Sequence, residues 1–382
     1  MKKIIYLDNA ATTQVDPAVA KVAGKFMTKS YGNASTLYSL GREARKAVED
    51  ARKKIAEFLN VSSEEIIFTS GGTEANNMAI KEIAFANRER GNHIITSVIE
   101  HPSVIESCRF LEKMGFKVSY IPVDNKGIVN PKDVEKALTK ETILVTIMHV
   151  NNEIGTIQPI EEIAEICKNK NILFHTDAVQ SFGKLKIDAS KFDLLSASGH
   201  KINAPKGVGF LYVKRGVKIH PMMHGGGQER GLRSGTENVS GIAAIGKAVE
   251  IAEERIKKNE AEKVRKLRDK LIGELLKIRG ARLNGSREKR IFNNVNVSFE
   301  DVEGEGLVLL LDEKEICCST GSACSSHSLK SSSVLKAIGL GDIEAHGSLR
   351  LTLGWETSDR EIDYAVSEIK KAVEKLRKIY GK

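Results

Sequence analysis

The sequence lacks the marks of disulfide-rich, secreted and membrane-spanning proteins. Its five cysteines are an odd number and include no Cys-x-x-Cys pair, which argues against a disulfide framework and against a structural zinc site. No apolar run approaches the length that crosses a membrane. The amino terminus meets the acidic Asp8 after a few apolar residues, unlike a signal peptide. We therefore expect a cytoplasmic protein without a membrane partner, in which any special cysteine acts as a free thiol.

A basic stripe interleaved with aromatic residues, which is typical of nucleic-acid-binding proteins, is also absent. The chain holds 59 Lys and Arg against 50 Asp and Glu, a net charge of +9, which could attract an anionic partner. The basic residues are instead spread over the faces of predicted helices, as on a solvated surface. The composition, 41% hydrophobic and 29% charged, is that of an ordinary globular protein. We expect no direct nucleic-acid partner.

The sequence contains no internal repeats and no long linkers. At about 150 residues per domain, its 382 residues suggest two or three domains. Short apolar strands alternate with amphipathic helices in the first part of the chain. The expected strands cover residues 65–70, 94–97, 118–121, 143–148, 172–175, 192–197 and 208–213. This alternation predicts an α/β fold with a doubly wound, mainly parallel sheet that binds ligands at the carboxyl ends of its strands.

A second, smaller unit is expected after the glycine-rich residues 225–227. A long helical region begins near Thr236 and continues as an apolar stripe to Ile278. Ser358 and Glu361 predict a capping box for the final helix. Between these helices the sequence predicts two strands, at residues 294–299 and 349–353, and a serine-rich loop at residues 319–333.

Three groups of chemically suggestive residues fall where predicted strands end. Lys201 closes the string Ser198-Gly199-His200-Lys201, where an amine could be desolvated and reactive, although most lysines at loop mouths are simply solvated. Gly71-Gly72-Thr73 opens a helix, which suits either a bound phosphate or an ordinary capped turn. Asp177 suits either a helix cap or the partner of a pyridinium nitrogen. A lysine, a carboxylate and an anion site are together the three parts that a pyridoxal phosphate enzyme needs.

Beyond these residues, the sequence closely resembles the cysteine desulfurases of the NifS/IscS group, which are fold-type I pyridoxal phosphate enzymes. The resemblance runs nearly end to end, and several of its motifs are specific to this group rather than to aminotransferases at large. The motifs are Tyr6-Leu7-Asp8-Asn9-Ala10-Ala11-Thr12-Thr13, Thr69-Ser70-Gly71-Gly72-Thr73-Glu74, Glu100-His101, Met148-His149-Val150-Asn151-Asn152-Glu153-Ile154-Gly155, Asp177-Ala178-Val179-Gln180, Ser198-Gly199-His200-Lys201, residues 224–238 and Gly321-Ser322-Ala323-Cys324.

The resemblance implies a fold-type I architecture with two domains. The large, cofactor-binding domain would span residues 14–258, with a mainly parallel seven-stranded sheet flanked by helices. A smaller α+β domain would combine residues 1–13 and 259–382 and carry a mobile catalytic loop at about residues 319–333. The active form would be a homodimer.

The resemblance also implies a role for each matching residue around pyridoxal 5′-phosphate. Lys201 would form the Schiff base and shuttle protons, and His101 would stack on the pyridine ring and act as acid or base. Asp177 would pair with the ring nitrogen, and Gln180 would donate to the phenolic oxygen. The phosphate would be held by Gly72, Thr73, Ser198, His200 and, from a second subunit, Thr236.

L-Cysteine is the implied substrate. Its carboxylate would be held by Arg350, Asn152 and Asn33, with Asn152 also near the cofactor; the planar guanidinium of an arginine suits a carboxylate geometrically.

Cys324 would be the nucleophile that takes the substrate sulfur as a persulfide, so that L-alanine is released. Cys108 and Cys167 lie on apolar helical faces and are expected to be small buried thiols. Cys324 instead lies in polar, serine-rich sequence, as expected for a reactive thiol. The sulfur would pass to an iron–sulfur scaffold protein or another acceptor, including tRNA thiolation enzymes. The resemblance also allows a transient [2Fe-2S] cluster ligated through Cys324; no other metal site is expected.

The sequence departs from the pattern expected of the group at three places. Cys317 and Cys318 precede the loop, where one of these thiols could accept the persulfide or form a regulatory disulfide. Ser325-Ser326-His327 follows the nucleophile in place of a run that contains threonine. Asn203-Ala204 after the lysine is also unusual.

Two other functions fit some of these features. A β-eliminating lyase or selenocysteine lyase would use the same cofactor but would not need Cys324. A non-catalytic assembly partner could offer Cys324 as a cluster ligand but would not need Lys201.

Overall fold

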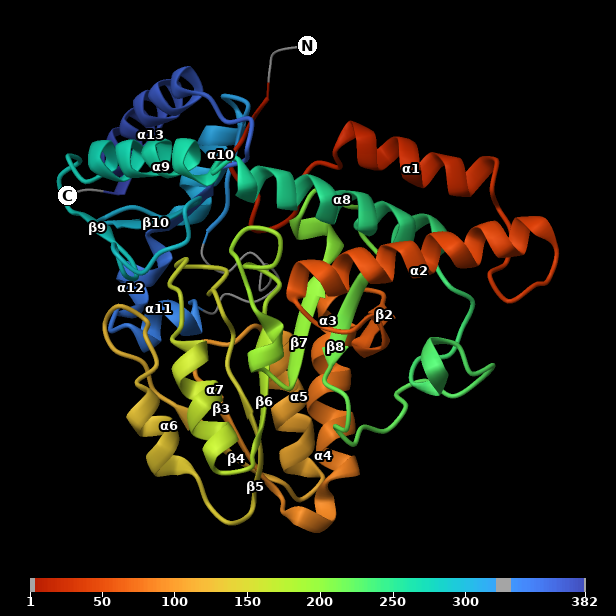
Figure 1. Ribbon diagram of the computed structural model, residues 1–382. Coiled ribbons are helices and arrows are strands. Elements are labelled where there is room, and N and C mark those ends of the chain that lie inside the picture. Colours follow the sequence, from red (N-terminus) through yellow and green to blue (C-terminus); the bar gives the residue numbers. More distant parts are fainter. Residues whose placement is uncertain (1–3, 321–330, 381–382) are drawn as a thin grey trace.

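The computed structural model describes residues 4–320 and 331–380. A seven-stranded sheet lies at the centre of the larger part of the molecule (Figure 1), in the order β2-β8-β7-β6-β5-β3-β4. β8 runs antiparallel to both of its neighbours, and the other neighbouring pairs are parallel. The strands are β2 (Ile66–Thr69), β3 (His93–Ser97), β4 (Lys117–Ile121), β5 (Thr142–Thr146), β6 (Leu173–Asp177), β7 (Leu194–Ser198) and β8 (Gly209–Val213). The predicted mainly parallel α/β sheet is confirmed.

Alternate residues of these strands face two different helical layers, as the period of two in a strand requires. Leu195 and Phe210 pack in one core with α1 (Pro17–Thr28), α2 (Ser39–Leu59), α6 (Pro131–Ala137), α7 (Ile160–Asn169) and α8 (Val239–Lys257). Leu194 and Leu211 pack in the other core with α3 (Gly72–Asn77), α4 (Ile83–Ala86) and α5 (Pro102–Lys113). Because both faces are covered, the central strands are buried along almost their whole length, including their polar residues.

A smaller three-stranded antiparallel sheet, in the order β12-β10-β9, has its own apolar core. Beside it, β1 and β11 form a short parallel pair. The strands are β1 (Ile5–Tyr6), β9 (Ala281–Leu283), β10 (Asn294–Phe299), β11 (Ile316–Cys317) and β12 (Ser348–Thr352). The helices are α9 (Ala261–Leu275), α10 (Gly304–Asp312), α11 (Ser333–Ala337), α12 (Asp342–His346) and α13 (Asp359–Tyr380). The residue boundaries expected for two domains stay a prediction.

Two expectations for the helices can be compared with the structure. The long helical region expected from Thr236 is two helices, α8 and α9, because the chain turns between them at Asn259, whose φ is 52°. The capping box before α13 is confirmed: Glu361 accepts from the Ser358 N–H at 2.8 Å, and the Glu361 N–H donates to Ser358 Oγ at 3.4 Å. No helix in the described ranges is long and apolar enough to cross a membrane.

The segment at residues 7–13 joins the two sheets. The Thr352 N–H of β12 donates to the Leu7 carbonyl at 2.7 Å, and the Thr13 N–H donates to the His200 carbonyl at 2.9 Å. Asn9 Nδ2 adds a bond of 2.8 Å to the Thr352 carbonyl. The segment therefore crosses the carboxyl ends of β6 and β7, where the candidate site lies.

Candidate functional site

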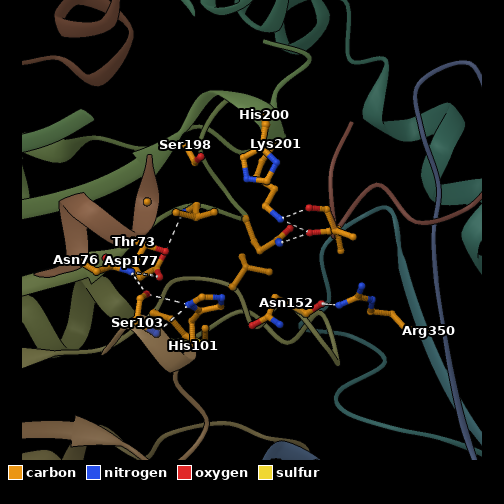
Figure 2. Close-up of a pocket in the computed structure, with 17 residues that line it drawn as sticks. Thr73, Asn76, His101, Ser103, Asn152, Asp177, Ser198, His200, Lys201 and Arg350 are labelled. Atoms are coloured by element: carbon orange, nitrogen blue, oxygen red, sulfur yellow. Dashed lines mark hydrogen bonds between the residues drawn. The ribbon is translucent and has the colours of Figure 1, made fainter. Parts of the chain in front are cut away.

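A cavity of about 400 Å³ opens at the carboxyl ends of the central strands. Figure 2 shows Asp177 and Asn76 on one side of it, Arg350 on the opposite side, and Lys201 and His101 between them. Of the residues predicted from the sequence, ten line this cavity: Gly72, Thr73, His101, Asn152, Asp177, Gln180, Ser198, His200, Lys201 and Arg350.

Lys201 lies in a short 3₁₀ turn (Gly199–Lys201) that directly follows β7. Its Nζ donates to the carbonyl oxygens of Ala10 at 2.5 Å and Ala11 at 2.6 Å. The segment at residues 7–13 therefore holds the amine inside the cavity, half shielded from solvent.

Asp177 is the last residue of β6 and is buried. Its Oδ1 accepts from the Val179 N–H at 2.9 Å, and its Oδ2 accepts from Asn76 Nδ2 at 2.7 Å. The carboxylate is therefore fixed in orientation, as a partner for a protonated ring nitrogen must be.

The residues at the start of α3 and the end of β7 fit a phosphate. A Cβ added to Gly72 would lie 2.6 Å from Val179 Cγ2, so that any larger residue here would displace the Val179 side chain. Burial, together with the charges of Lys201, Lys206 and Lys184, lowers the pKa of His200 to about 4. The same three positive charges attract a phosphate dianion.

Gln180 is held between the amino-terminal segment and a second buried lysine that was not predicted. Gln180 Nε2 donates to the Ala10 carbonyl at 3.0 Å, and Lys184 Nζ donates to Gln180 Oε1 at 3.3 Å. Burial, with a smaller contribution from Lys201, lowers the pKa of Lys184 to about 7. The sequence signal was a lysine four residues after Gln180 in an otherwise small and apolar segment.

Arg350 reaches the cavity from β12 and is 3% exposed. Its Nη2 lies 2.8 Å from Asp8 Oδ1, and its Nη1 donates to the Asn152 carbonyl at 3.2 Å. Its Nε–H is buried and meets no acceptor among residues 4–320 and 331–380. A buried unpaired donor on a guanidinium suits the carboxylate of a substrate.

Two predicted residues lie outside the cavity. Asn33 is exposed in the connection between α1 and α2, where its Oδ1 accepts from the Ser35 N–H at 2.8 Å. Thr236 is exposed just before α8. Within one chain, neither residue is brought to Lys201. Cys324 lies outside the described residues.

The other four cysteines are poor nucleophiles. Burial raises the pKa of Cys108, Cys167 and Cys318 to about 12 and also raises that of Cys317. A thiol with a raised pKa forms little thiolate at neutral pH, which argues against Cys318 as a persulfide acceptor. In the described part of the chain, no group of three His, Cys, Asp or Glu side chains could hold a metal ion.

The backbone conformation explains why an asparagine occupies position 203, which was unusual in the sequence. Its φ is 64°, in the left-handed region that asparagine tolerates better than most residues. Its Nδ2 donates to the Gln14 carbonyl at 2.8 Å, and its Oδ1 accepts from Arg255 at 3.0 Å. Asn203 therefore ends the turn that carries Lys201.

Sequence reasoning assigned no role to Asn76 and Ser103, which also line the cavity. Asn76 Nδ2 donates to Ser103 Oγ at 2.9 Å, and Ser103 Oγ lies 2.8 Å from His101 Nδ1 (Figure 2). Asn76 lies two residues after the motif that ends at Glu74, and no spacing rule connects it to a serine 27 residues later.

Comparisons with known proteins agree with this geometry. The aminotransferase class-V family model matches residues 5–365. A cysteine desulfurase IscS from Dictyoglomus turgidum is 51% identical over 382 residues, which cover 99% of this chain and 97% of that protein. A solved NifS-like protein has a TM-score of 0.92 at 40% identity, covering 97% of this chain and 100% of the other. SspA in complex with cysteine has a TM-score of 0.81 at 39% identity, covering 91% and 98%.

Proposed function

Because the chain belongs to the aminotransferase class-V family and, within it, to the cysteine desulfurases, we propose that it converts L-cysteine to L-alanine and transfers the sulfur to Cys324. The observation that carries this proposal is one cavity lined by an amine, Lys201, and by a buried guanidinium, Arg350, whose Nε–H meets no acceptor among the described residues. An amine that removes a proton and a cation that holds a carboxylate are what an amino acid substrate needs.

The residues around Asp177 and Gly72 fit pyridoxal 5′-phosphate, the cofactor that this family implies. Bound covalently through Lys201, it would supply a sink for the electrons of the substrate Cα–H bond. Asp177 would face its ring nitrogen and Gln180 its phenolic oxygen. The phosphate would be held by Gly72, Thr73, Ser198 and His200.

In the proposed reaction, Arg350 and the Asn152 amide bind the substrate carboxylate and orient its Cα toward Lys201. Once the substrate amine has taken its place on the cofactor, the Lys201 amine would take the Cα proton and later return one. The Cys324 thiolate attacks the substrate sulfur, so that an S–S bond forms while the C–S bond breaks. The electron pair of the C–S bond stays with the carbon skeleton, which is protonated and leaves as L-alanine. The persulfide on Cys324 then supplies iron–sulfur cluster assembly or another acceptor.

A homodimer is part of this proposal. Thr236 and Asn33 are exposed in one chain, so their roles in the site require a second copy. Large apolar side chains near Asn33 are also exposed, as expected of an interface; they are Met27, Tyr31, Leu37 and Tyr38. Sedimentation should give the mass of two chains, and a Thr236→Ala variant should weaken cofactor binding without dissociating the dimer.

The decisive experiment incubates the yellow protein with L-cysteine and a thiol reductant and measures alanine and sulfide. We expect both products in equal amounts, and an absence of alanine would overturn the proposal. A Cys324→Ser variant separates the alternatives: full-rate release of sulfide or selenide would indicate a lyase. A colourless protein that is unaffected by borohydride would indicate a non-catalytic partner.

A further inference from the structure

The His101 side chain caps the helix that it begins. α5 starts at Pro102, and the His101 Nδ1 accepts the Ser103 N–H at 3.1 Å. This position is usually filled by a side-chain oxygen of Ser, Thr, Asp or Asn. A backbone N–H can only donate, so His101 Nδ1 must present a lone pair and carries no proton.

The Ser103 hydroxyl fits the same assignment. Asn76 Nδ2 lies 2.7 Å from Asp177 Oδ2 and 2.9 Å from Ser103 Oγ. The amide cannot be reversed, because its oxygen would then face the carboxylate. Ser103 Oγ therefore accepts from Asn76. Because His101 Nδ1 already accepts the Ser103 N–H and carries no proton, the Ser103 hydroxyl proton points to it, with Oγ 2.8 Å from Nδ1. Donation runs in one direction along this chain of contacts, from Asn76 to His101.

We propose that Ser103 and Asn76 are positioning residues that hold His101 as a neutral imidazole with its one proton on Nε2. Figure 2 shows the second ring nitrogen of His101 facing away from Ser103, toward the space between Lys201 and Asn152. His101 therefore donates a hydrogen bond into the cavity, to an atom with a lone pair, and does not act there as a base. The base of the proposed function, on which this inference rests, is then Lys201.

The surroundings of His101 favour the neutral form. Burial lowers its pKa, the charge of Lys201 lowers it further, and the Asp177 carboxylate opposes both. Because Asn76 donates to Asp177 and to Ser103 at once, the carboxylate and the imidazole are fixed relative to each other.

The test is ¹⁵N NMR of the histidine ring nitrogens in the holoenzyme without substrate, with His101→Gln to assign the signals. We expect an unprotonated Nδ1 and a protonated Nε2 from pH 6 to pH 9. A proton on Nδ1, or a doubly protonated ring at pH 7, would overturn the inference. The measurement needs no turnover, so failure to form alanine would refute the proposed function and leave this result standing.

Variants of two serines on α5 then test the positioning role. Ser103→Ala should shift the His101 ring signals and lower kcat about tenfold with a smaller change in KM, whereas Ser103→Thr should restore both. Ser107→Ala is the matched control, since Ser107 Oγ donates only within the helix, to the Ser103 carbonyl at 2.7 Å. Unchanged His101 signals in Ser103→Ala, or equal shifts in Ser107→Ala, would rule out the role of Ser103.

Discussion

On one side of the cavity, Asp177 and Ser198 are the last residues of β6 and β7, two neighbouring strands of one sheet, and Lys201 lies in the turn after β7. On the other side, Arg350 comes from the smaller sheet and meets Asn152, 198 residues earlier in the chain. The first side is assembled by the topology of a single sheet. The second side depends on how two separate hydrophobic cores pack against each other. Its geometry is therefore more sensitive to substitutions far from the cavity.

The largest effect should come from the sheet side. Lys201→Ala removes the proposed base and cofactor anchor, and we expect alanine formation to fall by at least ~10³-fold. The control is Lys218→Ala, an exposed lysine that does not line the cavity, which should retain nearly full activity. Substantial turnover in Lys201→Ala would contradict the assignment of the proton transfer to the sheet side of the cavity.

Arg350→Lys tests the opposite side. The charge is kept but the planar set of donors is lost, so KM for L-cysteine should rise roughly 10- to 100-fold. The visible absorption of the bound cofactor should not change, because Arg350 belongs to the substrate side. Arg282→Lys, at an exposed position of β9, is the matched control. A changed cofactor spectrum in Arg350→Lys would show that the two sides are not separable.

Lys184→Met should stabilise the cofactor-free protein. The pKa of Lys184 is lowered from 10.5 to about 7, so the unfolded chain binds this proton more readily, and stability rises as pH increases from about 7 to 10.5. The variant should gain roughly 2 kcal/mol at pH 6 in denaturant unfolding, and the gain should shrink toward pH 10. An equal gain in the exposed control Lys186→Met would contradict this explanation.

Glu153→Gln tests the substrate side in the same way. Burial raises the pKa of Glu153 to about 7, although the hydrogen bond from Ser332 and the positive charge of Arg350 both lower this pKa. The folded protein keeps this proton while the unfolded chain loses it near pH 4.5, so stability is lost as pH rises through 7. Between pH 5 and pH 8, the wild type should lose about 2 kcal/mol more than Glu153→Gln. The exposed Glu162→Gln should follow the wild type.

The smallest effect is expected from Cys318→Ala. The raised pKa of the buried thiol leaves it almost wholly protonated at neutral pH, so the rates of alanine formation and sulfur transfer should not change. Slower sulfur transfer to an added acceptor, with unchanged alanine formation, would show that Cys318 does accept the persulfide sulfur.

The sheet side was the more predictable half from sequence. Asp177 and Lys201 follow apolar strands, and the carboxyl ends of parallel strands meet at one edge. The pairing of Arg350 with Asp8 gave no local signal, because the two residues are 342 positions apart. Lys184 and Asn76 were missed for a related reason: their roles come from burial and from tertiary hydrogen bonds, which spacing does not encode. The turn at Asn259 between α8 and α9 was missed because an asparagine in a helical pattern does not by itself indicate a left-handed conformation.

The contact of residues 7–13 with β12 also sets an order of events during synthesis. Leu7 and Asn9 bind Thr352, and the Ala10 N–H donates to Thr352 Oγ1 at 2.8 Å. A ribosome releases Thr352 about 150 residues after Lys201. The strands of the large sheet all precede Thr352 in the chain, whereas residues 7–10 can form their hydrogen bonds to Thr352 only after β12 has been synthesised. The segment that holds Lys201 is therefore fixed in place later than the sheet that carries Lys201.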